Sequence, residues 1–168
     1  MHTTSGRVSG PDTLDGGSLD DNLWGGAGDN LLRGFVGNDN LFGELGNDQL
    51  VDGAGNNVLT GGLGNDTYQV TGGTQQLVMD DGGTDIRVAS DVYASYSTLY
   101  RELDTLLIAR FDGSLIQIDR QWLAVSRVEG FLFADGYFSA ADIERRAMAI
   151  PPDQGSCESD GGGAVTCQ

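Results

Sequence analysis

A nine-residue period without insertions covers the stretch from Arg7 to Gln69. In one frame the seven units read RVSGPDTLD, GGSLDDNLW, GGAGDNLLR, GFVGNDNLF, GELGNDQLV, DGAGNNVLT and GGLGNDTYQ. Position four is glycine in six of the seven units, position six is always Asp or Asn, and position eight is always large and apolar. Such a period indicates a repeat architecture, in which each unit buries its apolar side chain only by stacking on its neighbours.

The spacing predicts a flattened right-handed spiral with two units in each coil. Three residues around position eight suit a very short strand whose central side chain points inward. The six residues before them are rich in glycine, which reaches positive φ at little steric cost, so they form the turn. The position-eight residues should then stack into one interior ladder, which consists of Leu14, Leu23, Leu32, Leu41, Leu50, Leu59 and Tyr68.

The same stacking places position-six residues of alternate units side by side, eighteen residues apart. One edge would carry Asp12, Asn30, Asp48 and Asp66, and the other Asp21, Asp39 and Asn57. Rows of carboxylates repel each other unless a cation lies between them. The available ligands are hard oxygens, and residues 7–69 contain no His or Cys, which favours Ca²⁺ over zinc and over the more demanding Mg²⁺. A disordered Gly/Asp/Asn linker is the alternative, but a linker would not keep an apolar residue at every ninth position.

This tandem, in-phase pattern resembles the GGxGxDxUx calcium-binding nonapeptides of the RTX (repeats-in-toxin) family, which bacteria secrete through the type I pathway. The resemblance implies an all-β fold, with a right-handed parallel β-roll over residues 7–69. It also implies that backbone carbonyls of the turns complete the shell of each Ca²⁺. The expected ligands are the side chains of Asp12, Asp21, Asn30, Asp39, Asp48, Asn57 and Asp66 and the carbonyls of Gly10, Gly17, Gly26, Gly28, Gly37, Gly46 and Gly55.

Composition changes after the repeats, and residues 70–150 read as a β-rich cap for the open end of the roll. Alternating stretches predict strands at 76–79, 85–88, 98–101, 105–110, 115–118 and 128–133. Ser139 with Asp142 predicts a helix N-terminus, with Ile143, Ala147 and Ile150 on one face and Pro151-Pro152 as the end. The segments GGTDIRV, LLIARFDGSLIQIDRQW and VEGFLFADGYFSAADIE are similar to the flanking block of adenylate-cyclase-toxin-like proteins, which implies that the cap nucleates calcium-dependent folding.

Charge restricts the partners of the chain. The formal net charge is −16, which argues against nucleic acid and anionic membranes and fits cations. Residues 7–69 hold ten acidic residues and two arginines, a net of −8, together with fifteen glycines. We therefore expect the repeats to be unfolded without Ca²⁺. Residues 151–168 read as a flexible tail, in which Cys157 and Cys167 are close enough in sequence to form a disulfide outside the cell.

The sequence shows none of the HExxH, GxSxG or GxGxxG motifs, and this predicts a noncatalytic module. By resemblance, it would be the monomeric C-terminal part of a secreted toxin or enzyme. It would pass through the type I secretion machinery and fold in extracellular calcium. The start of the sequence has no apolar signal-peptide core, but type I substrates carry an uncleaved C-terminal signal.

A binding function is the alternative. Trp24 and Phe42 occupy position nine of units two and four, so they should be neighbours on one outer sheet face. Such a pair could bind a polysaccharide or another surface in an adhesin-like role, or it could contact an upstream catalytic domain.

Overall fold

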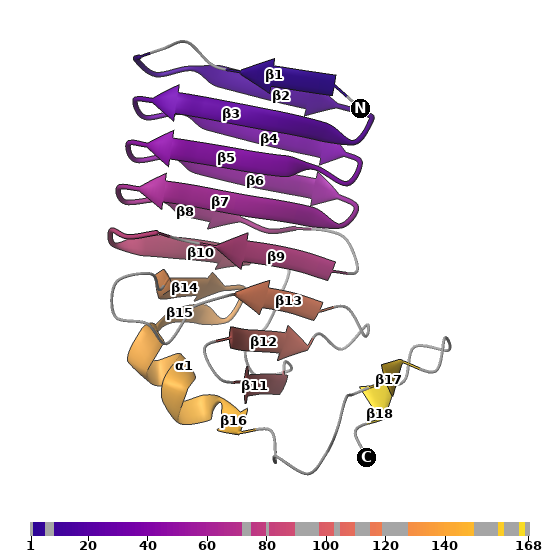
Figure 1. Ribbon diagram of the computed structural model, residues 1–168. Coiled ribbons are helices and arrows are strands. Elements are labelled where there is room, and N and C mark those ends of the chain that lie inside the picture. Colours follow the sequence, from indigo (N-terminus) through magenta and orange to yellow (C-terminus); the bar gives the residue numbers. More distant parts are fainter. Residues whose placement is uncertain are drawn as a thin grey trace.

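The computed structural model describes residues 2–5, 9–71, 75–79, 81–89, 98–102, 105–109, 115–118, 128–149, 158–159 and 165–166. Successive strands of the repeats alternate between two facing sheets, and all of them pair in parallel with the strand one coil away (Figure 1). The predicted β-roll is thereby confirmed.

One sheet of the roll contains β1 (His2–Ser5), β3 (Asp21–Ala27), β5 (Asn40–Leu45) and β7 (Asn57–Leu63). The other contains β2 (Thr13–Gly17), β4 (Leu31–Val36), β6 (Gln49–Ala54) and β8 (Thr67–Gln69). Strand β1 was not expected from the repeat frame, and it pairs with residues 21–24 of β3. Strands β2 to β7 are also longer than the predicted three residues, because the ladder continues past position eight into the first residues of the next unit.

The interior of the roll is the predicted ladder of position-eight side chains. All seven are buried, and none is more than 4% exposed. Adjacent members lie directly opposite each other in the sheet registers, for example Leu23 with Leu41 and Leu32 with Leu50. No single unit could shield its own leucine, so burial of this column links every coil to the next.

The roll does not stop at the last nine-residue unit. Strand β9 (Gln75–Met79) pairs in parallel with β7, and β10 (Asp85–Ala89) pairs in parallel with β8. Val51 pairs with Gln69 at an offset of eighteen residues, whereas Asn57 pairs with Gln76 at an offset of nineteen. One extra residue therefore enters between Gln69 and Gln76, and the roll continues in a shifted frame.

The remaining strands extend both sheets beyond the roll. Antiparallel strands β13 (Leu115–Ile118), β12 (Thr105–Ala109) and β11 (Thr98–Glu102) follow β9. The hairpin of β14 (Val128–Phe133) and β15 (Gly136–Ser139) follows β10. These strands contribute the apolar residues that cover the end of the leucine ladder, namely Leu99, Leu106, Ile108, Ile116, Ile118, Phe131 and Phe133.

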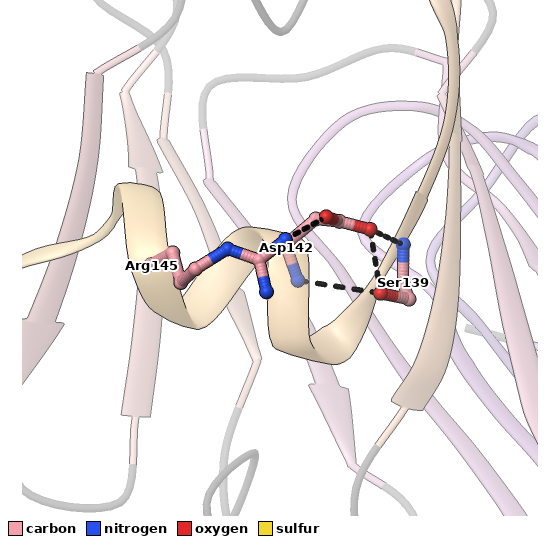
Figure 2. Close-up of polar contacts among 3 residues, drawn as sticks. All are labelled: Ser139, Asp142 and Arg145. Carbon is pink, nitrogen blue, oxygen red and sulfur yellow. Dashed lines mark hydrogen bonds and ion pairs between the residues drawn. The ribbon is translucent and has the colours of Figure 1, made fainter.

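Helix α1 (Ala140–Arg146) begins at the predicted capping box. The Ser139 hydroxyl accepts from the Asp142 backbone N–H, and the Asp142 carboxylate accepts from the Ser139 backbone N–H at 3.0 Å (Figure 2). Arg145 forms an ion pair with the same carboxylate (Figure 2). These contacts hold the pKa of Asp142 below its ordinary value, and the largest cause is the hydrogen bond that the Ser139 hydroxyl donates to the Asp142 carboxylate at 2.6 Å.

The predicted end of this helix at Pro151-Pro152 is wrong. Ala147 already has an extended backbone (φ −67°, ψ 125°) and is the C-cap, so it does not continue the helical face of Ile143. The chain then forms β16 (Met148–Ala149), which pairs in parallel with β11. Pairing at the sheet edge thus takes over before the prolines are reached.

The tail contributes two short antiparallel strands, β17 (Glu158–Ser159) and β18 (Val165–Thr166). Cys157, Cys167, Ile150 and the two prolines lie outside the described residues. In the described part of the chain, no helix has the length and apolar character needed to cross a membrane.

Candidate metal sites at the turns of the roll

Side chains at position six form two files, one along each edge of the roll, as the spacing predicts. In every member after the first of each file, a side-chain oxygen accepts from the backbone N–H of the position-six residue one coil earlier, at 2.7 to 2.9 Å. One file comprises Asp12, Asn30, Asp48 and Asp66, and the other comprises Asp21, Asp39 and Asn57. All except Asp12, which is half-buried, are shielded from solvent.

The second carboxylate oxygen of these aspartates is the chemically informative atom. Oδ2 of Asp48 is buried and accepts no hydrogen bond, and the same is true of Asp39. Oδ2 of Asp48 faces the Cα of Gly43. A Cβ added there would clash both with this oxygen and with the carbonyl oxygen of Gly61 in the next coil. Two buried acceptors, Oδ2 of Asp48 and the Gly61 carbonyl oxygen, thus face one space that stays open only because residue 43 is glycine. Acceptors in this arrangement require a proton or a cation between them.

The asparagines of the two files show how the space beside the second side-chain atom can be bridged. In Asn30 the atom corresponding to Oδ2 is the amide nitrogen, which donates to the carbonyl of Gly28 at 2.8 Å. The amide of Asn57 makes a longer contact of 3.5 Å with the carbonyl of Gly53. An ionised aspartate has no proton to donate to a turn carbonyl. Where the file carries aspartate, a cation would fulfil the bridging role that the amide N–H has in Asn30.

The glycines whose backbone carbonyls are the predicted metal ligands fall into two groups. Gly10, Gly28, Gly37, Gly46 and Gly55 occupy position four with φ between 106° and 142°. They stack closely: a Cβ on Gly46 would strike the carbonyl of Gly28, and one on Gly28 would strike that of Gly10. Gly17 and Gly26 occupy position two instead, at φ 110° and 91°, on β2 and β3.

Burial disfavours the ionised form of the central aspartates. It raises the pKa of Asp39, and the carboxylates of Asp21 and Asp20 raise it further, while the hydrogen bond from the Asp21 N–H opposes this. Burial likewise raises the pKa of Asp48 against the opposing hydrogen bonds from Asn30. Without a counter-charge these turns are electrostatically costly at neutral pH.

The structure adds Asp85 to the first file, which the nine-residue frame missed. The backbone N–H of Asp66 donates to Oδ1 of Asp85 at 2.6 Å, across an offset of nineteen residues. Gly83 (φ 141°) stacks on Gly64 in the same way as the position-four glycines. The sequence GGTD carries this turn chemistry, but the extra residue between Gln69 and Gln76 places it one residue out of frame.

A second polar ladder at position five was also missed. The side-chain oxygen of Asp20 accepts from the backbone N–H of Asn38, and that of Asn38 accepts from Asn56, at 2.8 and 2.9 Å. The other edge repeats this pattern at 2.8 Å through Asp29, Asn47, Asn65 and Thr84. The available signal was that position five is Asp or Asn in every unit except the first. This ladder is exposed, and its stacked side-chain oxygens accept from backbone N–H groups, so burial does not create a demand for a metal here.

Asp52 is an acid inside the roll that belongs to neither file. It occupies position one, where five other units have glycine, and it is fully buried. Its Oδ1 accepts from the N–H of Gly53 at 2.5 Å and from the N–H and hydroxyl of Thr71 at 2.9 and 3.1 Å. Burial raises the pKa of Asp52, while these bonds and buried Arg87 of β10 lower it. Asp52 thus ties β6 to the segment that leads into the cap.

Trp24 and Phe42 lie side by side on the outer face of β3 and β5, as predicted. Their rings stack with centroids 5.6 Å apart and planes 14° from parallel. The pair borders a hollow of about 200 Å³ that is also lined by Glu44, Thr60, Gly62, Leu63 and Asp81.

Within the described ranges, no three His, Cys, Asp or Glu side chains converge on one point. The carboxylates come instead from adjacent coils, and turn carbonyls would have to supply the remaining ligands. Oxygen-only donor sets of this kind suit Ca²⁺. The fold and the turns together therefore define a cation-binding parallel β-roll.

Comparison with known families identifies the repeats. The family described as "RTX calcium-binding nonapeptide repeat (4 copies)" matches residues 9–34, 15–50 and 43–74. Residues 9–74 therefore belong to the RTX calcium-binding nonapeptide repeat family, whose members bind Ca²⁺ and are typically secreted. No curated protein matches the chain. The narrower resemblance of the cap to adenylate-cyclase-toxin-like proteins stays a prediction.

Proposed function

We propose that the chain is a calcium-triggered folding module of a secreted bacterial protein that leaves the cell through a type I pathway. The observation that carries this proposal is the buried, hydrogen-bond-free Oδ2 of Asp39 and Asp48. Burying these charges without metal disfavours the folded roll in the calcium-poor cytoplasm. Millimolar extracellular Ca²⁺ lies in the range that extracellular calcium modules bind, about 10⁻⁴–10⁻³ M, so folding would follow export.

Six inter-turn sites would hold the ions. Five follow from the nine-residue frame: Asp12/Asn30, Asn30/Asp48, Asp48/Asp66, Asp21/Asp39 and Asp39/Asn57. The hydrogen bond from Asp66 to Asp85 adds a sixth at the junction with the cap. Sites with two carboxylates, such as Asp48/Asp66, should bind most tightly, because ligand charge is a main determinant of calcium affinity. Carbonyls of Gly10, Gly17, Gly26, Gly28, Gly37, Gly46 and Gly55 would complete the shells.

The module would have no catalytic role of its own. Acidic pairs in the repeats are engaged by backbone N–H groups and aligned in files, an arrangement suited to cations rather than to an acid/base pair. The activity of the secreted protein would then belong to a part of it outside this module.

Isothermal titration calorimetry of the full chain tests the proposal. We expect several bound Ca²⁺ ions per chain, together with a gain of β-sheet circular dichroism over the same concentration range. Magnesium at equal concentration serves as the control, since it requires a tighter octahedral shell. A stoichiometry of one ion or none would refute the assignment.

Calcium-dependent binding of a polysaccharide or another surface is the second candidate function. It rests on the stacked rings of Trp24 and Phe42, because exposed neighbouring aromatic rings can contact sugar rings. Binding to an array of glycans at a fixed calcium concentration would support it, provided that Trp24→Ala abolishes the signal while the variant still folds.

A further inference from the structure

Position two of the repeat requires a left-handed backbone. Gly17, Gly26, Gly53 and Gly62 occupy it with φ between 91° and 110°. Phe35 (φ 70°) and Glu44 (φ 79°) occupy the same position and are the non-glycine residues with positive φ among those described. A side chain is disfavoured in this conformation, and such outliers concentrate at functional sites. Both side chains are exposed on an outer face of the roll, so interior packing does not account for their presence.

On the β2–β4–β6 face, the structure shows what Phe35 does. The guanidinium of Arg33 lies over its ring, with Cζ 5.6 Å from the centroid. The same guanidinium makes a bidentate pair with Asp15, at 2.6 and 2.9 Å. The strained side chain thus completes a site for a cation between an aromatic ring and a carboxylate.

The opposite face has aromatic and acidic side chains at the same two repeat positions, but with the two kinds exchanged, and none of the described residues that line its hollow is basic. Trp24 and Phe42 occupy position nine there, where Arg33 lies on the other face, and Glu44 occupies position two. They border the hollow of about 200 Å³, whose other charged lining residue is Asp81. As described, this lining comprises aromatic faces and carboxylates without a basic side chain.

We propose that this groove binds a cationic side chain, an arginine or lysine presented by an extended basic segment of a partner protein. Aromatic faces attract guanidinium and ammonium groups, and the carboxylate of Glu44 adds a charge that a neutral sugar would not use. An anionic ligand is disfavoured both by this carboxylate and by the net charge of −16. The chain itself contains no lysine and only nine arginines, so long-range attraction also favours a basic partner.

The inference rests on the calcium-folded roll of the proposed function, so folding is measured first and separately by circular dichroism. Binding is then measured by calorimetry on the folded full chain at saturating calcium and physiological ionic strength. The probe is a short glycine-arginine peptide, and its control is the same peptide with citrulline, which keeps the shape of arginine and removes the charge. We expect the citrulline peptide to bind several-fold more weakly.

Two variants locate the site. Glu44→Gly introduces the glycine that the neighbouring coils have at the paired positions 26 and 62. We expect it to raise the thermal midpoint of unfolding by removing strain, yet to weaken the arginine peptide about two- to fivefold. Phe42→Leu should weaken binding by a similar factor. Asp29→Asn is the matched charge control, because Asn already occupies the next position of that ladder, and it should leave binding unchanged.

Any of the following outcomes would overturn the proposal. Equal binding of the arginine and citrulline peptides, or an equal loss in Asp29→Asn and Glu44→Gly, would mean that no cation site exists here. Preferential binding of a neutral oligosaccharide, lost in Phe42→Leu, would assign the groove to a sugar. If calcium does not fold the chain at all, the proposed function fails before any peptide is added, so the two failures are distinguishable.

Discussion

The backbone N–H of Asp66 donates to the carboxylate of Asp85 at 2.6 Å, which carries the file of position-six side chains out of the repeats and into the following block. The roll and its cap therefore share a turn rather than merely an apolar contact. Arg87, two residues further on, is fully buried opposite Tyr68 at the end of the interior ladder. The proposed metal sites and the closed end of the core therefore meet at this junction.

Removal of the cap should leave the repeats unfolded. Deleting residues 70–150 exposes Tyr68 and discards the apolar cluster that covers the ladder. We expect circular dichroism of the remaining repeats to stay that of an unfolded chain even in about 10 mM Ca²⁺, well above typical affinities. If they instead fold at the calcium midpoint of the whole chain, the cap is not required for folding.

Asp85→Ala should weaken calcium-dependent folding although the residue lies outside the repeats. It removes an acceptor from the Asp66 N–H and a ligand from the proposed sixth site. Loss of one site would lower the free energy of unfolding by about 2.7 kcal/mol at a calcium concentration a hundredfold above its Kd. Urea unfolding at fixed calcium measures this, with exposed Asp135→Ala as the control. Equal stabilities of the two variants would contradict the sixth site.

Asp48→Ala should be much more damaging than Asp12→Ala. Asp48 is buried, accepts from Asn30 and donates to Asp66, so it belongs to two proposed sites. Asp12 is half-buried and belongs to one terminal site. The calcium midpoint of folding should therefore rise more in Asp48→Ala. Identical midpoints would show that the sites do not share ligands.

Gly43→Ala should disrupt a single site by steric means. A Cβ there would collide with Oδ2 of Asp48 and with the Gly61 carbonyl, which face the same space. Gly10→Ala is the comparison, because a Cβ at Gly10 meets no atom within 4 Å and adds only the strain of φ 106°, about 1–2 kcal/mol. Calorimetry should find one ion fewer in Gly43→Ala only. An unchanged stoichiometry would place the ion elsewhere.

Acid should partly replace calcium. Burial raises the folded-state pKa of Asp39, Asp48 and Asp52 above the ordinary 3.8, so the folded form takes up protons more readily than the unfolded chain. Stability from these groups is fully present below pH 3.8 and is lost as pH rises through the folded-state pKa values. Calcium-free protein should therefore have more β-structure near pH 4 than at pH 7. With calcium the trend reverses, since protons compete for the ligands.

Circular dichroism at both pH values, with and without a chelator, checks this prediction. The Asp39→Asn/Asp48→Asn double variant should show a smaller acid-induced gain, because two of the titrating groups are gone. Acidification that unfolds the calcium-free chain further would contradict it.

The roll could be predicted from the sequence because every unit repeats the same physical requirement. An apolar residue at position eight and glycine at position four recur without exception or nearly so, and the strands obey them from Leu14 to Tyr68. The last coil was not predicted because one added residue between Gln69 and Gln76 shifts the frame, so Val78 and Arg87 take the inward positions one residue later than the repeat frame places them. The end of α1 was not predicted because β16 pairs with β11, and no local sequence pattern encodes this long-range contact.

The site residues also divide into those that the periodicity predicts and those that it does not. The two files of Asp and Asn followed from periodicity alone, since the offset of eighteen residues dictates which side chains meet. Asp52 did not, because its environment depends on Thr71 and Arg87 at the irregular junction. Glu44, like Phe35, departs from glycine at position two, and the strain becomes visible only in the backbone angles.

Alternation of successive units between two sheets has a consequence for how such a chain can change in length. Adding eighteen residues would insert one full coil and leave β9 and β10 each on its present sheet. Adding nine would exchange the sheets for everything downstream, so the cap would meet the roll with its two halves transposed. Variation by duplication is thus restricted by parity: the cap tolerates pairs of units and rejects odd ones.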